Sequence, residues 1–199
     1  MANICSNSTA FFGPKEDLER LLAALKSAKS VNLGKMFEKA TGEKAHDVLY
    51  GTQTIGGIED YRVSEKNGHE YFQLDYDSRW SPVNEEIDEM LRKHFPTIEE
   101  VTIAEEPGCD IYMNTDDEGI FFPERYDLDA SAKNRYTCDD EHYFETEEDV
   151  LKALNEFQRK NGLREFSSIQ EAEEWYGDED NNPDPNSDFF LHVHEYYSY

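Results

Sequence analysis

Three features of the sequence predict an α+β protein. Apolar residues alternate at a spacing of two in several short segments, which is typical of half-buried strands. Elsewhere they recur at spacings of three and four, which is typical of amphipathic helices. The 12 tyrosines and 12 phenylalanines among 199 residues provide material for a core, and no long apolar run predicts a transmembrane helix.

The first part of the chain is predicted to begin with a strand and two helices. Residues 1–12 form the expected strand, which ends at Gly13-Pro14 because glycine can cap a helix and proline fits its first turn. A helix then extends to about residue 29, and its apolar residues recur at helical spacing: Leu18, Leu21, Leu22 and Leu25. A shorter helix is expected over residues 33–40.

A hairpin, a helix and a strand follow. Residues 61–66 and 69–77 are predicted strands joined by Asn67-Gly68, which suits a type I′ turn. A helix begins at Ser81-Pro82 and leads into a strand over residues 98–103. This β-α-β-β-α-β order predicts a ferredoxin-like sandwich, in which two helices pack on one face of a four-stranded antiparallel sheet.

The rest of the chain is predicted to extend this sandwich with further strands and helices. Strands are expected over residues 109–115, 119–126, 136–144 and 189–199. Helices are expected over residues 146–162, where Thr146 and Asp149 make an approximate capping box, and over residues 168–176. We divide the chain into a ferredoxin-like domain, residues 1–125, and an acidic α+β extension, residues 126–199. This extension either folds independently or packs on the first sheet.

Four short segments of the first 125 residues form a pattern. They are Met1-Ala2-Asn3-Ile4-Cys5-Ser6-Asn7 with Gly13-Pro14 after it, Trp80-Ser81-Pro82, Phe95-Pro96, and Glu105-Glu106-Pro107-Gly108-Cys109. In this order and spacing they resemble the YubB-type ferredoxin-like family, bacterial proteins often associated with plasmids, phages and other mobile elements. The resemblance implies the fold and a bacterial setting, and it implies no catalytic residues.

The charge of the chain is strongly negative and unevenly distributed. Forty-five acidic and 19 basic residues give a net charge of −26. Residues 1–56 contain 6 acidic and 7 basic side chains, whereas residues 57–199 contain 39 and 12. Direct binding to nucleic acid or to an anionic membrane is therefore not expected, because both need clustered Lys and Arg. The charge favours a basic partner, imitation of nucleic acid, or solubility alone.

Two sets of residues near the C-terminus are candidates for binding sites. Aromatic side chains of this region are expected on the surface, where they would anchor a partner: Trp175, Tyr176, Tyr196, Tyr197 and Tyr199. His192 and His194 share one face of a predicted strand and could supply two metal ligands, with a carboxylate or Cys138 as the third. A partly buried aromatic–histidine surface is the alternative, and no cofactor is predicted.

Other chemically notable residues are expected to be structural. Asp75 and Asp77 lie on the polar face of the hairpin, as surface acids commonly do. Cys5 and Cys138 lack a neighbouring base, and Trp80, at a strand-to-helix corner, is expected to pack in the core. Three cysteines at no metal or disulfide spacing, with no secretory leader, predict a cytoplasmic protein with reduced thiols.

Three functional hypotheses follow from the sequence. The first is a non-enzymatic acidic binding module for a basic protein partner. The second is a DNA mimic that inhibits a nucleic-acid-binding enzyme. The third is a metal-dependent enzyme that uses His192 and His194.

Overall fold

The chain divides into two compact units, each built on its own antiparallel sheet. The computed structural model describes residues 3–132, 135–137 and 142–198. One unit comprises Met1–Phe122 with Ser198–Tyr199, and the other comprises Pro123–Tyr197. The boundary between the two parts was predicted after residue 125. The described residues form five α-helices, a six-stranded sheet and a four-stranded sheet, which is an α+β fold.

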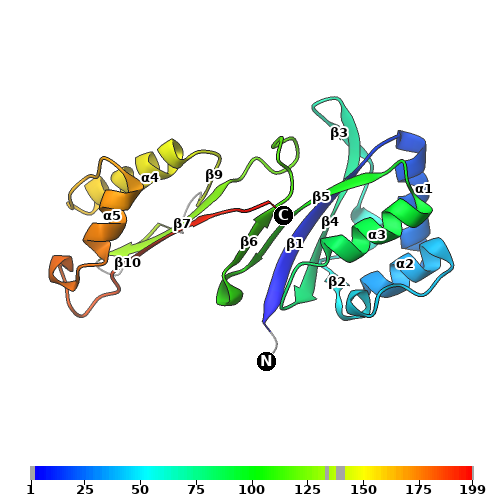
Figure 1. The fold of residues 1–199 in the computed structure, drawn as a ribbon, viewed down its shortest axis with the longest axis horizontal. Helices are drawn as coiled ribbons and strands as arrows, with labels where there is room; N and C mark the ends of the chain where they lie inside the picture. Colours follow the sequence, from blue (N-terminus) through cyan, green and yellow to red (C-terminus); the bar gives the residue numbers. More distant parts are fainter. Residues whose placement is uncertain (1–2, 133–134, 138–141, 199) are drawn as a thin grey trace. The chain divides into compact units, whose positions relative to one another are not determined.

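The first unit contains six strands and three α-helices (Figure 1). The strands are β1 (Ile4–Phe12), β2 (Gln53–Thr54), β3 (Ser64–Lys66), β4 (His69–Arg79), β5 (Glu99–Glu106) and β6 (Ile111–Asn114). The helices are α1 (Lys15–Ser27), α2 (Leu33–Thr41) and α3 (Asn84–His94). The sheet order is β2-β4-β1-β5-β6, and β3 also pairs with β4. Strand β1 is central and pairs antiparallel with both β4 and β5.

The three helices cover one face of the first sheet, and the main core lies between them and the sheet (Figure 1). The predicted alternation on β4 is confirmed, because Phe72, Leu74 and Tyr76 are all buried in this core. The Asn67-Gly68 turn is also confirmed, since both residues have positive φ angles. The third helix begins later than expected, at Asn84 rather than at Ser81-Pro82.

Trp80 differs from its expected place in the core. It is 52% exposed and has a φ of 71°, in the left-handed region. Strand β4 ends at Arg79, and the Trp80 backbone N–H then donates a hydrogen bond to the Asn3 carbonyl. This turn leaves the indole largely accessible to solvent, so the prediction of core packing for Trp80 is wrong.

The second unit contains four strands and two α-helices. The strands are β7 (Tyr126–Ala132), β8 (Arg135–Tyr136), β9 (Tyr143–Phe144) and β10 (Phe190–Glu195), and the helices are α4 (Glu147–Lys160) and α5 (Ile169–Tyr176). Strand β7 pairs with all three others. The predicted N-cap of α4 at Thr146 is confirmed, because the Thr146 side chain accepts a hydrogen bond from the Asp149 backbone N–H; the Asp149 side chain accepts from the Thr146 hydroxyl.

Two predictions about the later strands are corrected. The expected strand over residues 119–126 is wrong, since residues 119–125 form a turn and loop and β7 begins only at Tyr126. The later strands also do not all extend the first sheet: β6 joins it, whereas β7 to β10 form the second sheet. Within the expected strand 136–144, residues 138–141 lie outside the described residues. None of the described helices is both long and apolar enough to cross a membrane.

Candidate functional site: the open face of the second sheet

The second sheet has one face covered by helices and one face that is not. On β7 and β10, one set of alternate residues packs against α4 and α5 to form the core of the unit, including Leu128, Ala130 and Val193 (Figure 1). The other set points to the opposite face, on which no helix of the described residues packs. We call this surface the β7–β10 face and define it by Asp127, Asp129, Ser131, Tyr136, Phe190, His192 and His194.

Four aromatic rings form a row on the β7–β10 face. Tyr136 of β8 and Phe190 of β10 have ring centroids 6.4 Å apart. The Phe190 and His192 rings stack at 5.1 Å, and the His192 and His194 rings stack at 6.0 Å. The row is accessible at several points, because Tyr136 is 39% exposed and His192 is exposed.

Carboxylates lie beside this ring row. Asp129 is directly opposite His192 across the β7–β10 ladder, and Asp127 is directly opposite His194. One oxygen of Asp129, Oδ1, is buried and accepts no hydrogen bond from the described residues. At the other end of the row, the Tyr136 hydroxyl donates to Asp188 Oδ2 at 2.5 Å. The face therefore combines accessible aromatic rings with negative charge, an arrangement suited to organic cations.

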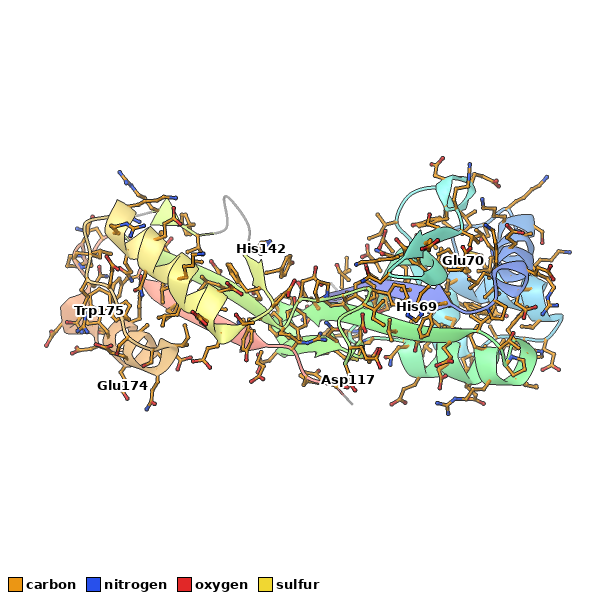
Figure 2. All side chains as sticks on the ribbon, turned by 90° about the horizontal axis from the view of Figure 1, so that it is seen from above. His69, Glu70, Asp117, His142, Glu174 and Trp175 are labelled. Atoms are coloured by element: carbon orange, nitrogen blue, oxygen red, sulfur yellow. The ribbon has the colours of Figure 1, made fainter. Side chains whose placement is uncertain are left out.

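The placement of His192 and His194 on one face is confirmed, and the sequence analysis did not identify the aspartates opposite them. A third histidine, His142, lies near β9 (Figure 2), with Nδ1 3.4 Å from Asp127 Oδ1. Within the described ranges, however, no group of three or more His, Cys, Asp or Glu side chains is arranged to hold a metal ion. Cys138, the other proposed ligand, lies outside these ranges.

Two of the five aromatic residues proposed as partner-binding anchors, Tyr176 and Tyr196, are buried. Tyr176 is 7% exposed, and its hydroxyl accepts a hydrogen bond from Gln158 Nε2 at 2.7 Å. Tyr196 is 6% exposed. Trp175, on α5 (Figure 2), is half-buried against the Phe189 ring at 5.2 Å. The expected surface exposure of Tyr176 and Tyr196 is therefore wrong, because both are buried and Tyr176 is part of the core of the second unit.

The remaining two proposed anchors are Tyr197 and Tyr199. Tyr197 is half-buried, and Tyr199 lies outside the described residues. The exposed tyrosines of the unit are instead Tyr136, on the β7–β10 face, and Tyr143, which lies opposite Asp127 on β9. Neither was predicted from the sequence as a binding residue. The signal that could have identified this face is the pair of period-two motifs Asp127-x-Asp129 and His192-x-His194, which lie opposite each other once β7 and β10 pair.

A groove of about 950 Å³ lies between α4 and strands β8 and β9, and Tyr136 of the β7–β10 face is one of its lining residues. Its charged lining residues include three of each sign: Arg135, Lys152 and Lys160 with Glu145, Asp149 and Glu156. Lys160 already pairs with Glu156 at 3.1 Å. This balance of charges gives the groove no preference for a cation or an anion.

The first unit contains a chain of buried hydrogen bonds on the helix-covered face of its sheet. The Tyr76 hydroxyl lies 2.8 Å from Thr9 Oγ1, which lies 2.7 Å from Thr102 Oγ1. Thr102 in turn donates to Glu100 Oε2 at 2.8 Å. Burial raises the pKa of the Glu100 carboxyl to about 7, against the lowering effect of the Thr102 hydrogen bond.

Most of this chain is inside the unit. Thr9, Thr102 and Tyr76 are fully buried and connect β1, β4 and β5 internally, whereas Glu100 is half-buried. The hairpin acid Asp75 also has a structural environment, because it accepts hydrogen bonds from Ser8 and Gln73.

Cys5 is fully inside the first unit. Its side chain is 0% exposed, and burial raises the pKa of its thiol to about 11. A thiol with a raised pKa carries little thiolate at neutral pH and is a poor nucleophile. The structural interpretation of Cys5 is therefore supported, and Cys138 lies outside the described residues.

No protein-family model, curated protein sequence or solved structure matches the chain. The resemblance to the YubB-type family stays a prediction from the sequence, and the function rests on the geometry described above.

Proposed function

We propose that this protein is a non-enzymatic binding module that docks a basic protein partner on the β7–β10 face. The observation that carries the proposal is the combination of an accessible ring row and the aspartates beside it on one sheet face, which no helix among the described residues covers. Interface hot spots are commonly aromatic residues at the centre of a patch, and opposite charge steers association.

The charge of the second unit supports a basic partner. Residues 123–197 contain 21 acidic and 7 basic side chains, a net charge of −14 within 75 residues. The two acids central to the β7–β10 face, Asp127 and Asp129, have no lysine or arginine directly opposite them on β10. A positively charged partner would therefore gain long-range attraction to the unit and local pairing on the face.

A titration of the full-length protein tests this proposal. The probe is a fluorescein-labelled 12-residue peptide of alternating lysine and serine. Its binding is measured by fluorescence anisotropy at 50 and 200 mM NaCl. We expect binding that weakens steeply with salt, because screening reduces attraction between exposed charges.

Two variants with equal charge changes locate the binding surface. Asp127→Asn with Asp129→Asn removes two charges from the β7–β10 face, whereas Glu173→Gln with Glu174→Gln removes two exposed charges from α5. We expect the first variant to weaken binding about two- to tenfold more than the second. Absence of binding, or equal effects of the two variants, would contradict the proposal.

We also propose that the first unit is ferredoxin-like. The support is the sequence order β1, α1–α2, β2–β3, β4, α3, β5, together with a central β1 that is antiparallel to both β4 and β5. Ser6 is the residue to follow by NMR, because its register partners are Asp77 on one side and Glu105 on the other. Cross-strand nuclear Overhauser effects to one neighbour alone would rule out this topology.

A further inference from the structure

The chemistry of the β7–β10 face discriminates between the two basic side chains. Resting on the proposed function, we propose that the partner binds through an extended, arginine-rich segment whose guanidinium groups pack on the parts of the Tyr136, Phe190 and His192 rings that the neighbouring rings leave accessible. Lysine-rich segments of the same charge would bind this face less tightly.

The first support is the spacing of the rings. Successive rings along β10 are 5.1 and 6.0 Å apart, from Phe190 to His192 and from His192 to His194. Alternate residues of an extended peptide are about 6.6 Å apart, because each residue of a strand rises about 3.3 Å. An extended segment along β10 would therefore bring every second side chain close to a successive ring.

The second support is the position of the carboxylates beside these rings. Asp129 lies across from His192, and Asp188 lies at the Tyr136 hydroxyl. A guanidinium group is planar, so it can stack on a ring with its face and donate hydrogen bonds to a carboxylate with its edge. A lysine ammonium group is a compact, strongly hydrated charge that does not combine the two contacts in this way.

The third support is the buried oxygen of Asp129. Its Oδ1 atom accepts no hydrogen bond within the described part of the chain, although a buried acceptor without a partner is unfavourable. The residue opposite it, His192, is exposed, so the position beside Asp129 is at the surface. Oδ1 has no accessible surface of its own, so an arginine donor placed over His192 would reach it only after the Asp129 side chain turns outward.

Other ligands fit this face less well. Stacked rings also bind the bases of single-stranded nucleic acid, but such sites need a positively charged groove for the backbone. The acids of the β7–β10 face and the net charge of −14 over residues 123–197 oppose a polyanion.

The test compares two peptides on the full-length protein. Both have 12 residues and a charge of +6 from their side chains, one alternating arginine with serine and the other lysine with serine. We expect the arginine peptide to bind about fivefold or more tightly, since each exposed cation–ring contact contributes about two- to fivefold in affinity. Anisotropy titrations at 50 mM NaCl measure both dissociation constants.

Variants test whether the rings cause the difference. Tyr136→Leu with Phe190→Leu removes two aromatic rings while keeping apolar side chains, and we expect it to reduce the arginine preference to about twofold or less. Trp80→Leu, which removes an exposed ring from the first unit, is the control and should leave the preference unchanged. Circular dichroism of each variant confirms that it is folded.

The outcomes separate this inference from the proposed function. If both peptides bind equally and the effect of the Asp127 and Asp129 substitutions persists, the arginine inference is wrong and the binding module stands. If neither peptide binds, both proposals are wrong. If the arginine preference survives the Tyr136 and Phe190 substitutions, the preference comes from another surface, and the inference is also wrong.

Discussion

The half-buried carboxyl of Glu100 makes a specific prediction about stability and pH. The pKa of this group is raised from an ordinary 4.5 to about 7, chiefly by burial, and the nearby charge of Asp88 adds to the effect while Arg92 opposes it. The folded protein therefore binds the Glu100 proton more tightly than the unfolded chain does. The stability from this group is complete below about pH 4.5 and is lost as the pH rises through 7.

The magnitude follows from the two pKa values. A difference of about 2.5 between folded and unfolded states corresponds to about 3 kcal/mol at pH 8 or above, since each pKa unit is worth about 1.36 kcal/mol. Glu100→Gln removes this titration and keeps an oxygen that can accept the Thr102 hydrogen bond. Relative to the wild type, we expect Glu100→Gln to gain about 1–3 kcal/mol between pH 5 and pH 8.

Urea unfolding at pH 5, 6, 7 and 8 measures this gain. The background variant Trp175→Phe leaves Trp80, in the first unit, as the tryptophan reporter, since the chain has two tryptophans. Glu99→Gln is the matched control, because Glu99 is the exposed neighbour on β5. A constant free-energy difference between Glu100→Gln and the wild type from pH 5 to pH 8 would show that Glu100 is not a buried acid that titrates near neutrality.

Two further predictions concern the second unit. Tyr176→Phe removes the acceptor of the Gln158 Nε2 hydrogen bond, and Gln158 is 0% exposed. We therefore expect the free energy of unfolding to fall by about 1–2 kcal/mol, measured by urea unfolding with Trp175 fluorescence as the signal. An unchanged midpoint and slope of the unfolding curve would contradict this prediction. Thr146→Ala removes the N-cap of α4 and should cost about 1 kcal/mol in the same assay, whereas Thr146→Ser should retain most of the stability. Equal losses in the two Thr146 variants would show that the cap hydrogen bond is not the cause.

Local sequence patterns predicted the parts of the fold that depend on neighbouring residues. The leucine spacing of α1, the turn at Asn67-Gly68 and the cap at Thr146 are all signals within a few residues, and the structure confirms each. Their physical causes are local: the periodicity of a helix, a positive φ, and a side chain that caps a helix.

Features that depend on strand pairing could not be predicted in this way. Glu100 resembles one more surface acid in an acidic sequence, and only the β1–β5 register, which pairs it with the buried Phe11, places its side chain on the helix-covered face. Similarly, Tyr176 and Tyr196 looked like surface aromatics within a polar region. A unit of about 75 residues has little apolar material, so Tyr176 becomes part of its core. Tyr196 is buried as well.

The ring row on the β7–β10 face is difficult to explain by folding stability alone. Cross-strand and same-face contacts on an exposed sheet surface contribute only about 0.2–1 kcal/mol each, and β-branched residues such as threonine provide similar stability with less exposed ring surface. In a chain with a net charge of −26, solubility also does not require these particular aspartates to lie beside rings. This surface stabilises the fold little, and it joins accessible rings to a carboxylate oxygen that accepts no hydrogen bond within the described residues; both features agree with the cationic partner that we propose.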